Sequence, residues 1–194
     1  MQLADCVGVA WDVLQYRLGR STLPPHAIKL RWIEYFGKAY KAHTLVETGT
    51  YYGMTVEAML RRFEQIYTIE LAVDLYERAE KQFAGYPHVR VLLGDSAEVL
   101  PALLEVISEK CLFWLDGHYS GSGTARGSAD SPIIGELNAI RKHSRNDHII
   151  LIDDARLFDG TNGYLTQQET FSLLREINPL YSVRQRDDII QAYC

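Results

Sequence analysis

The chain has 194 residues, which is most simply one domain, and 47% of them are hydrophobic, enough for a full core. Its net charge of −5 argues against a nucleic-acid partner, because phosphate contacts need clustered Lys and Arg. The three cysteines, Cys6, Cys111 and Cys194, are widely spaced and odd in number, so we do not expect a disulfide framework. The beginning of the chain lacks a basic signal region, and no stretch of 18 apolar residues exists. We expect a soluble cytoplasmic protein with no membrane partner.

Residues 1–43 are expected to form a helical N-terminal extension. Trp11, Leu14 and Leu18 share one helical face, and Pro25 can start a second helix, rich in tyrosine and tryptophan. The extension either packs on the edge of a sheet, which we favour, or covers a cofactor or substrate cleft, or pairs two subunits as a homodimer through surfaces such as Trp11 and Trp32.

From residue 44 to 194, strand and helix patterns alternate. Strands are predicted at 44–48, 66–70, 89–93, 112–116 and 149–153, and helices at 55–63, 74–83, 96–107 and 132–143. Ser96 can cap its helix, and Ser131 can cap the next with Pro132 at the first helical position. Alternation of this kind predicts an α/β fold with a parallel sheet and helices on both faces.

The C-terminal part breaks this rhythm. Thr166 and Glu169 form a capping box that opens a helix. Two strands at 181–184 and 189–193 follow, with only a few polar residues between them. They must run antiparallel, because a parallel return needs a long crossover.

The segment 46–54 forms the first strand-to-helix turn. Gly49 and Gly53 have no Cβ, so a ligand can approach the backbone closely there, beside the positive end of the following helix. No Lys lies between these glycines, so the turn suits a nucleoside or amino-acid-bearing cofactor more than a polyphosphate. An ordinary tight turn is the alternative.

An acidic residue stands at the end of each of the first five predicted strands: Glu47, Glu70, Asp95, Asp116, and Asp153 with Asp154. In open α/β sheets ligands bind beyond these carboxyl ends, and an acid ending the second strand commonly binds ribose hydroxyls. Clustered carboxylates repel one another unless hydroxyls, an ammonium group or a metal compensates them. Helix capping on the surface is the alternative for each acid taken singly.

Together, these features resemble a class I S-adenosylmethionine-dependent methyltransferase over 44–194. Segments 46–55 and 67–71 are most similar to the small metal-dependent O-methyltransferases of the catechol and macrocin kinds, although Tyr51 stands where a middle glycine is common. The resemblance implies a Rossmann-like sheet of order 3-2-1-4-5-7-6 with an antiparallel C-terminal hairpin. It implies that the cofactor contacts Glu47, Thr48, Gly49, Thr50, Tyr51, Gly53, Glu70, Asp95, Ser96 and Asp116.

Asp116, Asp153 and Asp154 follow neighbouring strands, so their carboxylates should converge, and oxygen ligands of this kind suit Mg²⁺. The resemblance places a metal here too. Such an ion would bind a substrate hydroxyl, lower its pKa and aim its oxygen at the methyl carbon. The alternative is that Asp154 caps a turn and Asp116 merely touches cofactor or substrate.

The loop 118–128 is rich in small residues and leaves from the same edge. We predict a flap over the substrate, or else a flexible connection. His118 is a candidate catalytic base beside Asp116, a metal ligand, or a structural histidine. Tyr119, Arg126 and Arg156 are candidate substrate contacts.

The sequence therefore predicts methyl transfer from S-adenosylmethionine to a hydroxyl of a small molecule such as a sugar, polyol or polyphenol, with Mg²⁺. Fold does not fix function, so two rivals stay open. One is a different enzyme on the same fold, resembling cephalosporin hydroxylase. The other is a non-catalytic module that binds the cofactor or another ligand.

Overall fold

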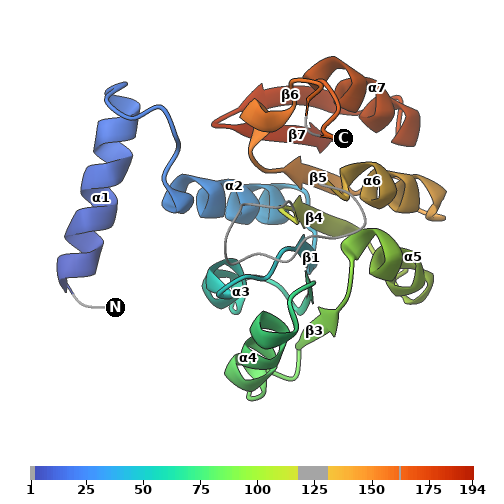
Figure 1. The fold of residues 1–194 in the computed structure, drawn as a ribbon, viewed down its shortest axis with the longest axis horizontal. Helices are drawn as coiled ribbons and strands as arrows, with labels where there is room; N and C mark the ends of the chain where they lie inside the picture. The colour runs from blue at the N-terminus through green and yellow to red at the C-terminus, as the bar shows by residue number, and fades with distance from the viewer. Residues whose placement is uncertain (1–2, 118–130, 162) are drawn as a thin grey trace.

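A computed structural model describes residues 3–117, 131–161 and 163–194, with side chains from residue 8 onward. Seven strands form one sheet in the order β3-β2-β1-β4-β5-β7-β6 (Figure 1). Neighbouring strands among the first five run parallel, whereas β7 runs antiparallel to both β5 and β6. The predicted fold class and strand order are confirmed. The strands are β1 Thr44–Thr48, β2 Gln65–Glu70, β3 Val89–Leu93, β4 Cys111–Leu115, β5 Ile149–Ile152, β6 Ser182–Arg186 and β7 Ile189–Tyr193.

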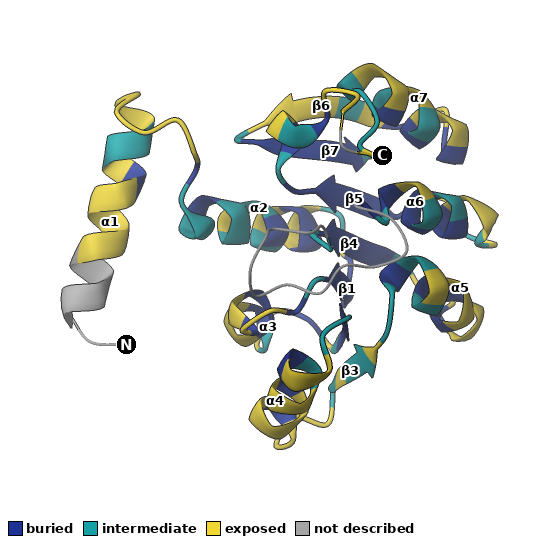
Figure 2. Ribbon diagram, in the orientation of Figure 1, coloured by how far each residue is buried: buried dark blue, intermediate teal, exposed yellow. Residues whose placement is uncertain are grey.

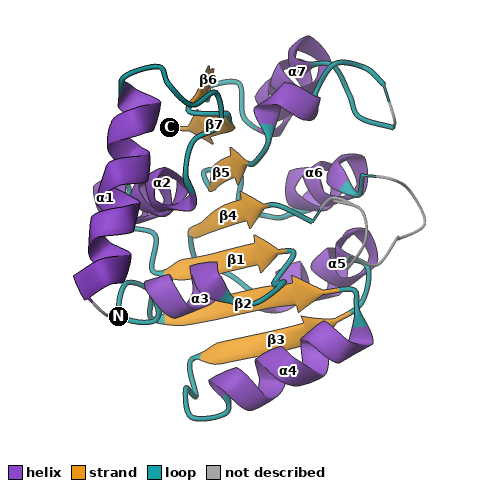
Figure 3. Ribbon diagram, turned by 60° about the vertical axis from the view of Figure 1, so that its left-hand side comes forward, coloured by secondary structure: helices purple, strands orange, loops and turns teal. Residues whose placement is uncertain are grey.

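Helices cover both faces of the sheet (Figures 1 and 3). The helices α2, α3 and α4 share a core cluster on one face, and α5, α6 and α7 share the cluster on the other. They are α1 Leu3–Arg17, α2 His26–Ala39, α3 Met54–Met59, α4 Val73–Phe83, α5 Ser96–Val106, α6 Ile133–Lys142 and α7 Gln167–Ile177, with a short 3₁₀ helix, η1, at Ala155–Leu157.

Strand alternation assigns each side chain to one of these faces. Leu45 and Trp114 belong to the cluster under α2, α3 and α4, whereas Val46 and Phe113 belong to the opposite cluster. Both faces of the central strands are buried, as Figure 2 shows in dark blue. This two-sided burial explains why these strands are continuous apolar runs.

Four helix starts and ends test the sequence reasoning. The capping box of α7 is confirmed: Thr166 accepts from the Glu169 backbone N–H, and Glu169 accepts from that of Thr166. Three details were wrong. The helix α3 ends at Met59 rather than at residue 63, Asp95 rather than Ser96 caps α5, and α6 begins at Ile133, after Pro132.

The N-terminal extension divides into two unequal parts. The helix α2 packs on the face of the sheet, not on its edge, with Ile33 and Phe36 fully buried. By contrast, α1 lies outside the sheet (Figure 1), and Trp11, Leu14 and Leu18 are exposed. The Tyr16 hydroxyl of α1 donates to Asp187 Oδ1 at 3.1 Å, in the turn between β6 and β7 at the sheet edge. The favoured placement on the sheet edge was therefore wrong for α2, whereas α1 contacts the edge hairpin.

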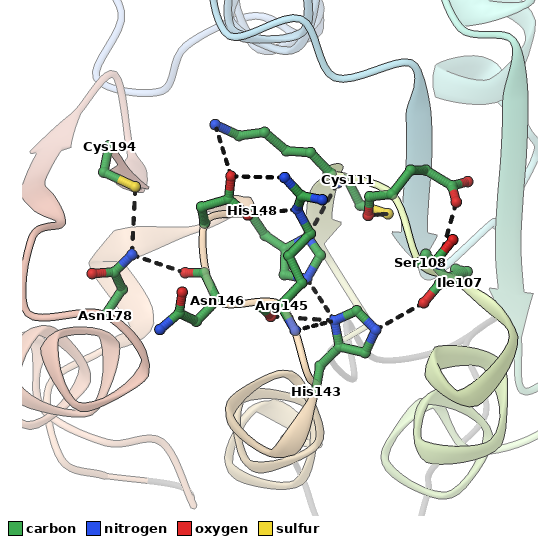
Figure 4. A network of polar contacts seen from close by, with 12 residues as sticks. Ile107, Ser108, Cys111, His143, Arg145, Asn146, His148, Asn178 and Cys194 are labelled. Atoms are coloured by element: carbon green, nitrogen blue, oxygen red, sulfur yellow. Dashed lines mark hydrogen bonds and ion pairs between the residues drawn. The ribbon is translucent and has the colours of Figure 1, made fainter.

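A chain of hydrogen bonds joins two histidines at the amino ends of β4 and β5 (Figure 4). The backbone N–H of Cys111 donates to His148 Nδ1 at 3.1 Å, His148 Nε2 lies 2.9 Å from His143 Nδ1, and His143 Nε2 lies 2.8 Å from the carbonyl of Ile107. Because the first donor and the last acceptor are backbone groups, we assign the tautomers in between: each ring is neutral and donates from Nε2. We call this chain the histidine relay.

In the described ranges, no helix is both long enough and apolar enough to cross a membrane. Cys111 and Cys194 are both free thiols.

Candidate functional site

The glycine turn after β1 is shaped by packing within the protein. Gly49 has φ +83°, and a Cβ there would lie 2.6 Å from the Asp116 carbonyl oxygen. Gly53 has φ +74°, and its Cβ would lie 2.8 Å from the ring of Phe83 on α4. Both positions therefore exclude a side chain because of close contacts with the protein's own residues, whereas the ligand approach to the backbone stays a prediction. Left-handed backbone and these contacts together require glycine.

Glu47 is a carboxyl group inside the sheet, 1% exposed. The β1–β2 register places it beside Thr68, whose Oγ1 donates to Glu47 Oε2 at 2.6 Å. Thr50 Oγ1 lies 2.5 Å from Thr68 Oγ1. Burial raises the pKa of Glu47 to about 8, although hydrogen bonds from Thr68 and Thr55 act in the opposite direction. The group is therefore poised to gain from a cationic partner.

Glu70 ends β2 and ties the glycine turn to it. Its Oε2 accepts the Tyr51 backbone N–H at 2.8 Å, and its Oε1 accepts that of Ala72 at 2.9 Å. Tyr51 itself is held at φ 49°, a left-handed conformation that non-glycine residues seldom adopt. Each carboxylate oxygen keeps a second lone pair, so a ribose hydroxyl can still donate to Glu70.

Asp95 and Ser96, which follow β3, lie at the start of α5. Asp95 accepts the Ala97 backbone N–H at 3.0 Å, which is a helix cap. Ser96 is buried, and its Oγ donates to Glu136 Oε1 on α6 at 2.5 Å. The hydroxyl of Ser96 is thus engaged inside the protein, and the cofactor contact of Asp95 and Ser96 stays a prediction.

The three aspartates after β4 and β5 act on one another electrostatically. Burial raises the pKa of Asp116 well above its usual range, and Asp153 and Asp154 raise it further. Burial also raises the pKa of Asp153. Glu47 acts in the same sense on Asp116, and Glu70 on Glu47. The acids at the ends of β2, β1, β4 and β5 therefore form a single group, which we call the acid rim: Glu47, Glu70, Asp116, Asp153 and Asp154.

A cation from the N-terminal extension enters the acid rim. Lys29 Nζ lies 2.6 Å from Asp153 Oδ2 and 3.1 Å from Asp154 Oδ1. The lysine side chain is 15% exposed, and those of the aspartates are 3% and 14% exposed. Burial lowers the pKa of Lys29, but the two aspartates outweigh that effect and raise it above its ordinary value. Lys29 is therefore an ammonium ion at neutral pH.

Arg156 supplies a second cation from η1. Its Nη1 lies 2.7 Å from Asp154 Oδ1 and also contacts Asp188 Oδ2, in the turn between β6 and β7. The Arg156 backbone N–H donates to Asp188 Oδ1 at 2.8 Å. Its predicted contact with substrate stays a prediction, since two protein carboxylates already engage the guanidinium.

The fit of a divalent ion can be judged from these contacts. In the described part of the chain, no group of three or more His, Cys, Asp or Glu side chains is arranged to hold a metal. Magnesium needs oxygen ligands at about 2.0–2.1 Å in octahedral geometry. The Lys29 ammonium already contacts an oxygen of Asp153 and one of Asp154. The described residues therefore do not fit the predicted Mg²⁺ site at Asp116, Asp153 and Asp154.

The predicted flap lies outside the described residues, together with His118, Tyr119 and Arg126. The alternatives for His118 stay as the sequence left them.

Comparisons with known proteins agree with this architecture. No family model matches the sequence, and no curated protein matches it either. Among solved structures, the O-methyltransferase TomG from Streptomyces achromogenes, in complex with SAM, has a TM-score of 0.58 at 15% identity, over 95% of this chain and 87% of that chain. The O-methyltransferase from Bacillus cereus, in complex with SAH, has a TM-score of 0.57 at 13% identity, over 96% and 91%. The SAH-bound methyltransferase PaMTH1 from Podospora anserina has a TM-score of 0.57 at 16% identity, over 85% and 77%.

The chain therefore has the Rossmann-like class I methyltransferase fold. In that fold, the acid rim lies at the edge where ligands bind, beyond the carboxyl ends of the strands.

Two residues of the site escaped the sequence reasoning. Lys29 stands four and seven residues before Ile33 and Phe36, so it continues the buried face of α2, and this spacing was a usable signal. Asp188 follows Asp187 between two closely spaced strands, which is typical of a hairpin turn whose central residues have positive φ. Both do, at 52° and 60°.

Proposed function

We propose that the protein is an enzyme, an S-adenosylmethionine-dependent methyltransferase that methylates a hydroxyl oxygen of a small molecule such as a sugar, polyol or polyphenol. The observation that carries the proposal is Glu47, a carboxyl group that is 1% exposed and accepts a hydrogen bond from Thr68. Burial raises its pKa to about 8, so a cation beside it would stabilise the ionised form. The α-ammonium group of S-adenosylmethionine is a cation of that kind. Ligands of open α/β sheets bind beyond the carboxyl ends of the strands, and Glu47 lies one residue before the end of β1.

The remaining cofactor contacts follow from neighbouring groups. Glu70 has lone pairs left for the ribose hydroxyls. The turn at Thr48, Gly49 and Thr50 would border the methionine part, with Gly53 beyond it. Asp95 would border the adenine from its place at the start of α5. When bound, the cofactor supplies a methyl group on a positively charged sulfur.

We assign Asp116 as the general base that accepts the proton of the acceptor hydroxyl. Its raised pKa makes its ionised form a stronger base than an ordinary carboxylate. Asp116 would accept the acceptor's O–H proton as the oxygen bonds to the methyl carbon, and would then release that proton to solvent. The electron pair of the carbon–sulfur bond would stay on sulfur, so the products would be the methyl ether and S-adenosylhomocysteine.

No step above uses a metal. The magnesium dependence predicted from the sequence was based on Asp116, Asp153 and Asp154, and the latter two already contact the Lys29 ammonium ion. The partner is proposed to be a small molecule, with neither nucleic acid nor membrane. A homodimer and a cytoplasmic location likewise stay predictions.

The direct test is to incubate the protein with methyl-labelled S-adenosylmethionine and a panel of hydroxylated acceptors, and to analyse the products. We expect label in an ether product and equimolar S-adenosylhomocysteine. An Asp116→Asn variant should bind the cofactor and lose turnover. Altered product without label would instead favour the hydroxylase-like alternative, and tight cofactor binding without turnover on any acceptor would favour a binding module.

A further inference from the structure

Lys29 lies in the part of the acid rim where the sequence predicts a metal. It reaches Asp153 and Asp154 from α2, across 124 and 125 positions of the sequence. Both contacts are short enough for charge-assisted hydrogen bonds, and all three side chains are mostly buried. The two aspartates therefore share a cation that the chain itself provides.

Packing fixes this position. Ile33 and Phe36, one and two turns further along α2, are 0% exposed within the cluster that also contains Leu112, Trp114 and Leu151. Asp116 and Asp153 continue the alternation of Trp114 and Leu151 beyond the strand ends, on this same face. The face that buries α2 is thus the face to which these acids belong, so packing of α2 places Lys29 beside them.

Because both are positively charged, the Lys29 ammonium ion and a divalent ion are alternatives at this site. Lys29 and Arg156 together bring two positive charges to Asp153 and Asp154, the same charge that Mg²⁺ would bring. A dication bound to these oxygens would lie within a few ångströms of Lys29 Nζ, and like charges at such distances repel strongly at a mostly buried site. The site holds one or the other.

We propose that Lys29 is the resident cation of this site and takes the place of a divalent metal. It orients Asp153 and Asp154 with two of its N–H groups, and a third N–H is left for the acceptor oxygen. The role of the third N–H rests on the proposed function, whereas the replacement of the metal does not. Methyl transfer at this site then runs without added metal.

The test measures Mn²⁺ binding by titration calorimetry and by the electron paramagnetic resonance signal of free Mn²⁺. The proteins are wild type, Lys29→Met, and the control Lys38→Met, which makes the same change at an exposed position of α2. We expect no Mn²⁺ binding below 1 mM, on the order of the weakest protein sites, by wild type or Lys38→Met. Lys29→Met should bind Mn²⁺ at least tenfold more tightly, because it removes the ammonium ion from Asp153 and Asp154. Lys29→Arg keeps the charge and should stay metal-free.

Micromolar Mn²⁺ binding by wild type would overturn the proposal, and this measurement needs no variant. A folded Lys29→Met protein that binds Mn²⁺ no better than wild type would overturn it too. Titration of wild type with S-adenosylhomocysteine separates the two proposals: its failure would remove the cofactor and leave the metal result standing. If the cofactor binds, turnover should be unchanged by chelation, and a tenfold loss on chelation would contradict the inference.

Discussion

Ionisable side chains are buried at both ends of the central strands, and the two ends stabilise them in opposite ways. At the carboxyl ends, the acid rim buries carboxyl groups and meets them with the ammonium of Lys29. At the amino ends, the histidine relay holds the buried ring of His148 and the half-buried ring of His143 between a backbone donor and a backbone acceptor. Each ring nitrogen of the relay has a hydrogen-bond partner within the protein. The rim keeps charge and lone pairs available, which is what a site for chemistry requires.

Acid should therefore act on the two ends with opposite sign. The folded-state pKa of Glu47, about 8, lies above its ordinary 4.5, so the folded state binds the proton more tightly and lowering the pH through this range stabilises it. Burial and His143 lower the pKa of His148 from 6.5 to about 4, so the unfolded state binds the proton more tightly there and acid destabilises the fold. The acid rim therefore favours a bound cation, whereas the histidine relay disfavours protonation of His148.

The largest effect is expected at Lys29. Replacing one partner of a buried ion pair leaves the other charge uncompensated, which costs about 4 kcal/mol. We expect Lys29→Met to lower the free energy of unfolding by that amount in urea at pH 7.5. The exposed control Lys38→Met should change it by less than about 0.5 kcal/mol. Equal effects of the two variants would mean that the rim does not depend on its cation.

The histidine relay should fail on acidification. One pKa unit corresponds to about 1.4 kcal/mol, so the shift at His148 predicts about 3 kcal/mol of stability, present in full above pH 6.5 and lost progressively as the pH falls to 4. Urea unfolding of wild type and His148→Gln from pH 7.5 to 4.5 should show a steeper loss in wild type. His43→Gln, at an exposed histidine, is the control. Parallel pH profiles for wild type and His148→Gln would refute the relay's role.

The backbone of the acid rim should be the next most sensitive. Gly49→Ala places a Cβ 2.6 Å from the Asp116 carbonyl oxygen in a left-handed conformation, for an expected cost of about 2 kcal/mol. Gly19→Ala is matched to it, because Gly19 also has a left-handed φ of +70° but a Cβ there meets nothing within 4 Å. Thermal unfolding of both variants measures the difference. If Gly19→Ala were as damaging, the contact with Asp116 could not be the cause.

The smallest effect concerns an ion pair beside the histidine relay. Arg145 Nε lies 2.6 Å from Asp147 Oδ1, but the two side chains are 41% and 37% exposed, so water screens the pair. Arg145→Gln should cost about 0.5 kcal/mol, far less than Lys29→Met. Urea unfolding of these two variants side by side compares an exposed ion pair with a buried one. A cost above about 2 kcal/mol for Arg145→Gln would contradict this reasoning.

Much of the fold followed from local patterns. The strand β1 occupies the predicted residues, and the capping box at Thr166 starts α7 where the sequence indicated. These features depend on alternation and on neighbours within four positions, which a sequence displays directly. The early end of α3 did not follow, because Phe63 keeps its apolar spacing and stays buried although the helix has ended.

The site was only partly predictable. The strand-end acids could be found from the sequence, and their convergence follows from the parallel sheet. Their counter-ion could not be fixed, because the choice between ammonium and metal depends on where α2 packs, over 100 residues before Asp153. The sequence singled out Gly53 because a ligand can approach a glycine closely. The structure adds a second reason, since Gly53 also accommodates the ring of Phe83, which lies 30 positions later on α4.

The central claim is that the acid rim binds S-adenosylmethionine through Glu47. Calorimetric titration with S-adenosylhomocysteine should give saturable one-to-one binding to wild type. Glu47→Gln should weaken it about 100-fold, the loss of a buried charge-assisted contact worth about 3 kcal/mol. Glu57→Gln, an exposed change on α3, should leave it unaltered. Unchanged affinity in a folded Glu47→Gln protein, or no binding by wild type, would contradict the account.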